Sequence, residues 1–221
     1  MIDAVRAVGC GDGAVARSLG RMTYWLFDID GTLVDSTPAV ERAWRTWAAE
    51  NGFDADEILA VSHGRRSEDT LADLLAPELV EPAYRRVLEL EMGDLDSVVA
   101  LPGAAEVLAS LPRDRWAAVT SGSRELMSAR LAAAGLPVPD VMVTAEDVEA
   151  GKPDPSGYLL AAELLGADPA DCLVIEDARA GLEAGTRAGC RVIAVATSHT
   201  PEQLDGYEII PDLTHLGEAN Q

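Results

Sequence analysis

The chain has 221 residues and a formal net charge of −21, from 38 acidic and 17 basic side chains. A surface this acidic repels nucleic acid and anionic membranes, and no apolar stretch is long enough to cross a bilayer. Its three cysteines, Cys10, Cys172 and Cys190, are widely spaced, which argues against a disulfide framework and favours a reducing, cytoplasmic location.

The first segment, Met1–Arg21, has neither a helical nor a strand period and lacks the continuous apolar run of a secretory signal. We expect residues 1–21 to form a loose N-terminal extension, with Met22 as the natural start of the protein.

Short apolar runs separated by helical patterns follow. The helical patterns between the later runs stop at Gly135, Gly166 and Gly189. Fully apolar strands that alternate with helices indicate a parallel sheet covered on both faces. The sequence therefore predicts an α/β fold with a Rossmann-like, doubly wound parallel sheet. The expected strands are Tyr24–Phe27, Trp116–Thr120, Val141–Thr144, Cys172–Ile175 and Arg191–Val195.

Residues 37–99 break this alternation, because they carry helical patterns alone. In Pro38–Glu50 the apolar residues recur at spacings of three and four, which is typical of an amphipathic helix. We expect further helices over Asp54–Val61, Ser67–Leu75 and Glu81–Met92. The interpretation is an α-helical cap domain (37–99) inserted into a core formed by residues 22–36 and 100–221.

Asp28-Ile29-Asp30-Gly31-Thr32 directly follows the first apolar run. Two acids at positions i and i+2 of an extended chain point the same way. Gly31 lets the backbone turn sharply, so that its amides can face a ligand. Such a pair can bind one hard divalent cation, or one acid can attack while the other transfers a proton.

Thr120-Ser121-Gly122-Ser123 ends the second apolar run and begins a helix. Hydroxyl groups and free amides at a helix N-terminus form a cradle for phosphate. Serine and glycine are also frequent in ordinary turns and caps, so this motif alone leaves both interpretations open.

Lys152, within Gly-Lys-Pro-Asp-Pro, is the only lysine beside sixteen arginines. That exception points to a need for a compact ammonium group in place of a planar guanidinium. Glu176 and Asp177 follow the fourth apolar run, where they either cap the next helix or complete a metal site with Asp28 and Asp30. All these motifs fall at the carboxyl ends of strands, the edge at which open parallel sheets bind ligands.

The order of the motifs, DIDGT, TSGS, GKPDP and ED, resembles that of the haloacid dehalogenase-like hydrolase superfamily. Longer segments such as DGTLVDSTPAVERAW and VTAEDVEAGKPDPSGYLLAAELLG are similar to sugar phosphatases, 2-deoxyglucose-6-phosphate phosphatases and glycerol-1-phosphatases of that superfamily. The resemblance implies Mg²⁺-dependent hydrolysis of small sugar or polyol phosphate monoesters through an aspartyl-phosphate. The implied partner is that small substrate, with neither nucleic acid nor membrane.

The resemblance also assigns roles to residues. It makes Asp28 the nucleophile and Asp30 the general acid and then the base. Mg²⁺ is expected at Asp28, the backbone carbonyl of Asp30 and Asp177, with Glu176 in support. The phosphate is expected to be bound by Thr120, Ser121, Gly122 and Lys152.

Substrate specificity is expected to lie in the cap. Arg66, together with His63 and Arg65, lies in the loop before the third cap helix, where related enzymes reach into the site. Glu41 lies on the first cap helix. The alternative for the arginines is a solvated surface charge, and Glu41 can instead pair with Arg45 four residues on.

The nearest alternative function is a phosphomutase resembling β-phosphoglucomutase, with the same core and cap. Similar mutases carry a histidine near the position of Glu41 and Ser-Arg where this chain has Arg66-Ser67, so the phosphatase is favoured. A phosphonate hydrolase needs a lysine in the cap, and residues 37–99 contain none. A dehalogenase lacks the second acid of the DxD pair, whereas this chain has Asp30 there. A non-catalytic binding protein would have lost a catalytic residue, and none is missing.

Overall fold

A computed structural model describes residues 24–62 and 64–216. Within these residues, a six-stranded sheet runs in the order β5-β4-β1-β6-β7-β8, and every neighbouring pair is parallel. Strand β1 therefore lies between β4 and β6, which brings the chain segments after these three strands to one edge of the sheet. The strands are β1 (Tyr24–Phe27), β4 (Trp116–Val119), β5 (Met142–Val143), β6 (Cys172–Glu176), β7 (Arg191–Val195) and β8 (Glu208–Ile210).

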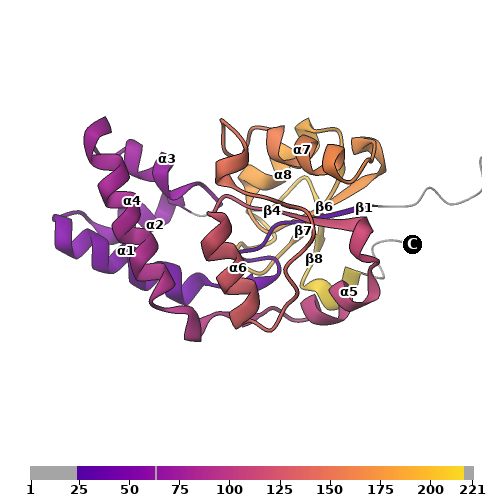
Figure 1. The fold of residues 1–221 in the computed structure, drawn as a ribbon, viewed down its shortest axis with the longest axis horizontal. Helices are drawn as coiled ribbons and strands as arrows, with labels where there is room; N and C mark the ends of the chain where they lie inside the picture. The colour runs from indigo at the N-terminus through magenta and orange to yellow at the C-terminus, as the bar shows by residue number, and fades with distance from the viewer. Residues whose placement is uncertain (1–23, 63, 217–221) are drawn as a thin grey trace, which may run out of the picture.

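Helices cover both faces of this sheet (Figure 1). Helices α7 (Ser156–Leu164) and α8 (Arg179–Arg187) lie on one face, and α5 (Ala104–Ser110) and α6 (Arg124–Ala133) lie on the other. Because successive side chains of a strand point to opposite faces, β1 sends Leu26 toward the first helix pair and Phe27 toward the second. The doubly wound parallel sheet that the sequence predicts is confirmed.

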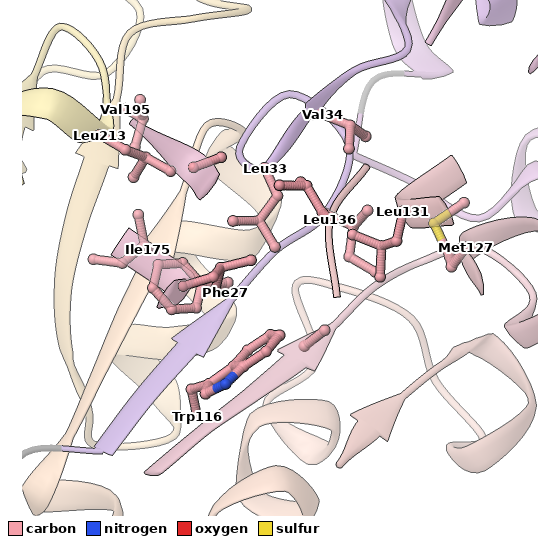
Figure 2. Close-up of a cluster of buried hydrophobic side chains, with 14 of the residues drawn as sticks. Phe27, Leu33, Val34, Trp116, Met127, Leu131, Leu136, Ile175, Val195 and Leu213 are labelled. Carbon is pink, nitrogen blue, oxygen red and sulfur yellow. The ribbon is translucent and has the colours of Figure 1, made fainter. Parts of the chain in front are cut away.

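The larger of the two core layers is built around aromatic and branched side chains (Figure 2). Phe27 of β1 and Trp116 of β4 meet edge to face, with ring centroids 6.2 Å apart. Met127 and Leu131 of α6 are fully buried in the same cluster. This packing fixes α6 against the sheet, and with it the loop that precedes α6.

The cap is joined to the core through a short antiparallel pair, β2 (Val34–Asp35) and β3 (Val99–Ala100). Between these strands the chain forms a group of helices that lies to one side of the sheet (Figure 1). They enclose a hydrophobic cluster of their own, which includes Trp44, Trp47 and Leu71. The inserted helical cap that the sequence predicts is thus present. Its elements are α1 (Thr37–Asn51), α2 (Ala55–Ser62), α3 (Ser67–Ala72), α4 (Pro77–Met92) and the 3₁₀ turn η1 (Leu95–Ser97).

Several local expectations need correction. Helix α4 begins at Pro77, not at Glu81, and it includes Pro82. Helix α3 begins at Ser67 as expected but ends at Ala72, not at Leu75. Strand β8 and helix α5 carry too short a pattern to be recognised in the sequence. The expected extension, residues 1–21, lies outside the described residues, and the exact domain boundaries stay a prediction.

Among the described residues, no helix combines the length and the apolar character that crossing a membrane requires.

The hydrophobic cluster of the cap gives a first prediction. Trp47 is 1 % exposed and stacks on Phe53, whereas Val61 of the same cap is 54 % exposed. Trp47→Ala should lower the free energy of unfolding by about 3–5 kcal/mol, because it leaves a large cavity. Val61→Ala should change it by less than about 0.5 kcal/mol. Urea denaturation followed by circular dichroism measures both, and equal effects of the two variants would contradict an independent cap core.

Candidate active site

Carboxylates at the ends of β1 and β6 contact Lys152, the only lysine of the chain. The Lys152 Nζ atom lies 2.5 Å from Asp28 Oδ1 and 2.6 Å from Glu176 Oε1. It also donates a hydrogen bond to the carbonyl oxygen of Val119, the last residue of β4, at 3.1 Å. The Lys152 side chain is 6 % exposed, so one buried ammonium ties together the ends of the three central strands.

Asp28, Glu176 and Asp177 form a compact cluster of acids. One carboxylate oxygen from each lies within 4.8 Å of the others, and all three residues are buried. Burial raises the pKa of the Asp28 carboxyl well above its ordinary value; Lys152 opposes this shift, while the charges of Glu176 and Asp177 add to it. Burial likewise raises the pKa of Asp177 to about 8, with the charge of Glu176 adding to the effect. The cluster is short of positive charge.

Lys152 itself stays protonated. Burial alone lowers the pKa of an ammonium group, but the charges of Asp28 and Glu176 outweigh burial and hold the pKa of Lys152 well above its usual range. If all three acids are ionised, Lys152 leaves two negative charges uncompensated, which one divalent cation would neutralise. Hard carboxylate oxygens are the donors that Mg²⁺ prefers, so the residues fit such an ion.

The three acids differ in how far their oxygens are already bound. Glu176 Oε2 accepts a hydrogen bond from the amide of Ala178 at 2.7 Å, and its Oε1 accepts from Lys152 and from the Tyr158 hydroxyl. Glu176 is therefore placed to anchor Lys152 and to support the cluster. Asp177 accepts hydrogen bonds from the side-chain hydroxyls of Ser198 and Thr32.

Gly31 allows this close approach. Its φ angle is +81°, and a Cβ atom placed on it would lie 2.2 Å from Asp177 Oδ2. Any side chain at this position would both strain the backbone and push Asp177 out of the cluster. The glycine of the DIDGT motif therefore serves to bring the strands' carboxylates together.

Asp30 faces away from Lys152, toward the junction of core and cap. Its Oδ1 accepts a hydrogen bond from the Ser36 hydroxyl at 2.7 Å, and its Oδ2 accepts one from Arg130 Nη1 at 2.7 Å. The side chain is 30 % exposed, so it can reach a molecule bound beside Asp28.

The TSGS segment forms the turn between β4 and α6. The Ser123 hydroxyl accepts from the amide of Leu126 and caps α6, and the amide of Gly122 donates to the Thr120 hydroxyl at 3.1 Å. The Ser121 hydroxyl donates to the carbonyl oxygen of Gly64 in the cap at 2.9 Å. The predicted phosphate loop thus also contacts the cap.

A cavity between core and cap brings these groups together. The core contributes acids, hydroxyls and Arg130, and the cap contributes a mixture of apolar and polar side chains. The predicted residues that line it are Asp28, Asp30, Thr120, Ser121, Gly122 and Asp177. The main cap residues that line it are Trp44, Arg65, Glu68, Tyr84, Leu88 and Glu91.

Two of the residues expected to set specificity, Arg66 and Glu41, do not line this cavity. Arg66 donates to the carbonyl oxygens of Val148 at 2.9 Å and Glu149 at 3.1 Å, in the loop before Lys152, because the chain turns into α3 at this point. Glu41 lies on α1 between Val40 and Trp44, which line the cavity, but it is not itself among the lining residues. The arginine of this loop that lines the cavity is Arg65, whereas Arg66 lines a smaller pocket beside Lys152. A role of Arg66 or Glu41 in specificity stays a prediction. His63, the third candidate, lies outside the described residues.

Sequence reasoning missed Arg130 and Glu91, although a signal existed. Arg130 follows Leu126 and Met127 at spacings of four and three on the buried face of α6, and Glu91 follows Val87 in the same way on α4. A charged residue on an apolar helix face is rare unless it is paired, so both positions were candidates.

Comparisons with known proteins place the chain in a family. A family model described as haloacid dehalogenase-like hydrolase matches residues 25–189, which include the strand, the acids and Lys152. The chain belongs to the haloacid dehalogenase-like hydrolase family.

Within this family the chain is 47 % identical to hexitol phosphatase A of Escherichia coli, over 80 % of this chain and 85 % of that protein. It is 37 % identical to glycerol-1-phosphate phosphohydrolase 2 of Saccharomyces cerevisiae, over 78 % of this chain and 74 % of that protein. Among solved structures it is similar to a hydrolase from Pseudomonas syringae, with a TM-score of 0.82 and 28 % identity, covering 90 % of this chain and 98 % of that one.

Glu91 predicts a pH dependence of stability. Burial raises its pKa from 4.5 to about 7; Arg130 opposes this shift, and the charges of Asp30 and Glu68 add to it. Between these pH values the folded chain holds a proton that the unfolded chain has released, so stability falls as the pH rises. At 1.36 kcal/mol per pKa unit, Glu91 should account for about 1–3 kcal/mol of the fall.

Thermal unfolding between pH 5 and pH 8 measures this contribution. Glu91→Gln should lose less stability over that range than the unmodified chain. Glu89→Gln is the matched control, because Glu89 lies on the same helix with 72 % of its side chain exposed. Parallel curves for all three proteins would show that Glu91 does not titrate as stated.

Proposed function

We propose that this chain is a Mg²⁺-dependent phosphatase that hydrolyses small sugar or polyol phosphate monoesters through an aspartyl-phosphate. The observation that carries the proposal is the buried contact of Lys152 with Asp28, inside a cluster that includes Asp177. The names of the relatives, which act on hexitol and glycerol phosphates, support the class of substrate.

In this proposal Asp28 is the nucleophile. Its carboxylate oxygen forms a bond to phosphorus as the bond from phosphorus to the alcohol oxygen breaks, and Asp30 gives the alcohol its proton. Water then attacks the phosphorus, Asp30 takes a proton from it, and inorganic phosphate leaves as the bond to Asp28 breaks. Lys152, the Ser121 hydroxyl and the amides at the start of α6 would stabilise the phosphate oxygens.

Mg²⁺ would be held by Asp28, Asp177 and the backbone carbonyl of Asp30, with Glu176 in support through Lys152. When bound, it would offset the repulsion between the Asp28 carboxylate and a dianionic ester. The remaining demand on the protein is to hold the ester in line with Asp28, which the cavity between core and cap would do.

The cavity favours a neutral, hydroxylated leaving group. Its cap side presents the carboxyl of Glu68 and the hydroxyl of Tyr84, which can bind hydroxyl groups, beside the apolar Trp44. Its two arginines are already paired, Arg65 with Asp73 and Arg130 with Asp30, both through carboxylates. A phosphomutase must hold a second phosphate, so these pairs favour the phosphatase over that alternative.

The free thiols Cys172 and Cys190 fit the expected cytoplasmic location.

A phosphate-release screen tests the function. It compares hexitol, glycerol, hexose and 2-deoxyhexose phosphates with phosphoglycolate, each with and without Mg²⁺. We expect release from the neutral polyol and sugar esters, and its loss when the metal is chelated. Conversion of β-glucose 1-phosphate to glucose 6-phosphate without phosphate release would establish the mutase instead.

Substitution of the two acids tests their roles. Asp28→Asn should abolish turnover, and Asp30→Asn should lower kcat by about 10²–10⁴-fold with little change in KM, because general acid–base catalysis contributes that much. Asp56→Asn is the control, since Asp56 is an exposed surface residue paired with Arg45. Phosphate release by Asp28→Asn at a rate near that of the unmodified chain would refute the nucleophile.

A further inference from the structure

Arg130 is buried between two carboxylates that come from different parts of the chain. Its side chain is 3 % exposed and projects from α6 in the core. Its Nη1 atom lies 2.7 Å from Asp30 Oδ2 in the core, and its Nη2 atom lies 3.5 Å from Glu91 Oε1 on cap helix α4. The guanidinium therefore spans the junction of core and cap.

This arrangement is poorly suited to stability alone. Taking a guanidinium and a carboxylate out of water costs several kcal/mol, and only good geometry offsets that cost. Among the described residues, Nε of Arg130 has no hydrogen-bond partner and Nη2 has only the long ion-pair contact with Glu91, while burial raises the pKa of Glu91 and so favours its neutral form. A well-packed apolar residue on this face of α6 would avoid these costs, so a role in the site is the better account.

The contact geometry at Asp30 shows what the guanidinium does. Arg130 holds Oδ2, and the Ser36 hydroxyl holds Oδ1, so both oxygens and hence the plane of the carboxylate are fixed. Ser36 and Arg130 are both buried, which restricts the movement of both supports. Glu91 orients the far side of the guanidinium from the cap.

We propose that Arg130 is a positioning residue that orients the Asp30 carboxylate toward the leaving oxygen. Through its contact with Arg130, Glu91 makes this orientation depend on how the cap lies against the core. The inference rests on the proposed function, in which Asp30 transfers the protons. Arg130 acts through Asp30 and touches no reacting atom.

The leaving group separates this role from a structural one. An alkoxide is a poor leaving group, so breaking the bond from phosphorus to a polyol requires a proton from Asp30 on the alcohol oxygen. p-Nitrophenolate is a stable anion and leaves without one. Misplacing Asp30 should therefore slow phosphorylation of Asp28 by glycerol 1-phosphate and leave phosphorylation by p-nitrophenyl phosphate nearly unchanged.

The experiment uses the full chain with Mg²⁺ in rapid-mixing, single-turnover reactions on both esters. For Arg130→Gln we expect glycerol release to slow by about 10- to 100-fold, with the single-turnover rate of p-nitrophenolate release within about twofold of the unmodified chain. KM should change little, and Arg130→Lys should recover part of the rate because it keeps a donor toward Asp30. Arg113→Gln, which breaks the exposed pair with Asp140, is the control.

Equal slowing of both esters by Arg130→Gln, or unchanged rates on both, would overturn the inference. Should the Arg130 variants fail to fold, Glu91→Gln decides: selective slowing of glycerol release supports the proposal, and unchanged rates refute it. If the unmodified chain releases phosphate from neither ester, the proposed function has failed, whereas an active chain with non-selective variants removes the role of Arg130 alone.

Discussion

The buried ammonium of Lys152 is the interaction on which the site depends. Asp28, Glu176 and Asp177 come from two strands of the sheet and repel one another in a space with little water. One positive charge, held by two of these carboxylates and a strand carbonyl, makes their assembly possible. Glu176 holds Lys152 through Oε1 and the amide of Ala178 through Oε2, so both of its oxygens are occupied.

The fold supplies the convergence. Parallel strands place all their carboxyl ends at one edge, so the order β4-β1-β6 alone brings the TSGS turn, the DIDGT segment and the Glu-Asp pair together. The two core layers hold the strands and α6 in place through residues such as Phe27 and Trp116. The cap, with a hydrophobic cluster of its own, closes the other side of the cavity.

The sequence carries most of the core site because the information is local. The motifs predicted to be catalytic lie after apolar runs, and the runs define the strands. The contacts made by the cap depend instead on the direction in which each side chain points. Arg65 and Arg66 are neighbours with identical side chains, yet the turn into α3 sends Arg65 to the cavity and Arg66 to the carbonyls of Val148 and Glu149. No periodicity distinguishes such adjacent residues, and the pairing of Arg130 with Glu91 requires knowing how α4 and α6 lie against each other.

The hydrogen bond from the Ser121 hydroxyl to the carbonyl oxygen of Gly64 has a further consequence. A hydroxyl group has one proton to donate, so Ser121 cannot serve the cap and an incoming anion at the same time. An anion that accepted this hydrogen bond would therefore break the contact between Ser121 and the cap. Occupancy of the cavity and the position of the cap would then be linked through one hydrogen bond, and such a linkage acts equally in both directions.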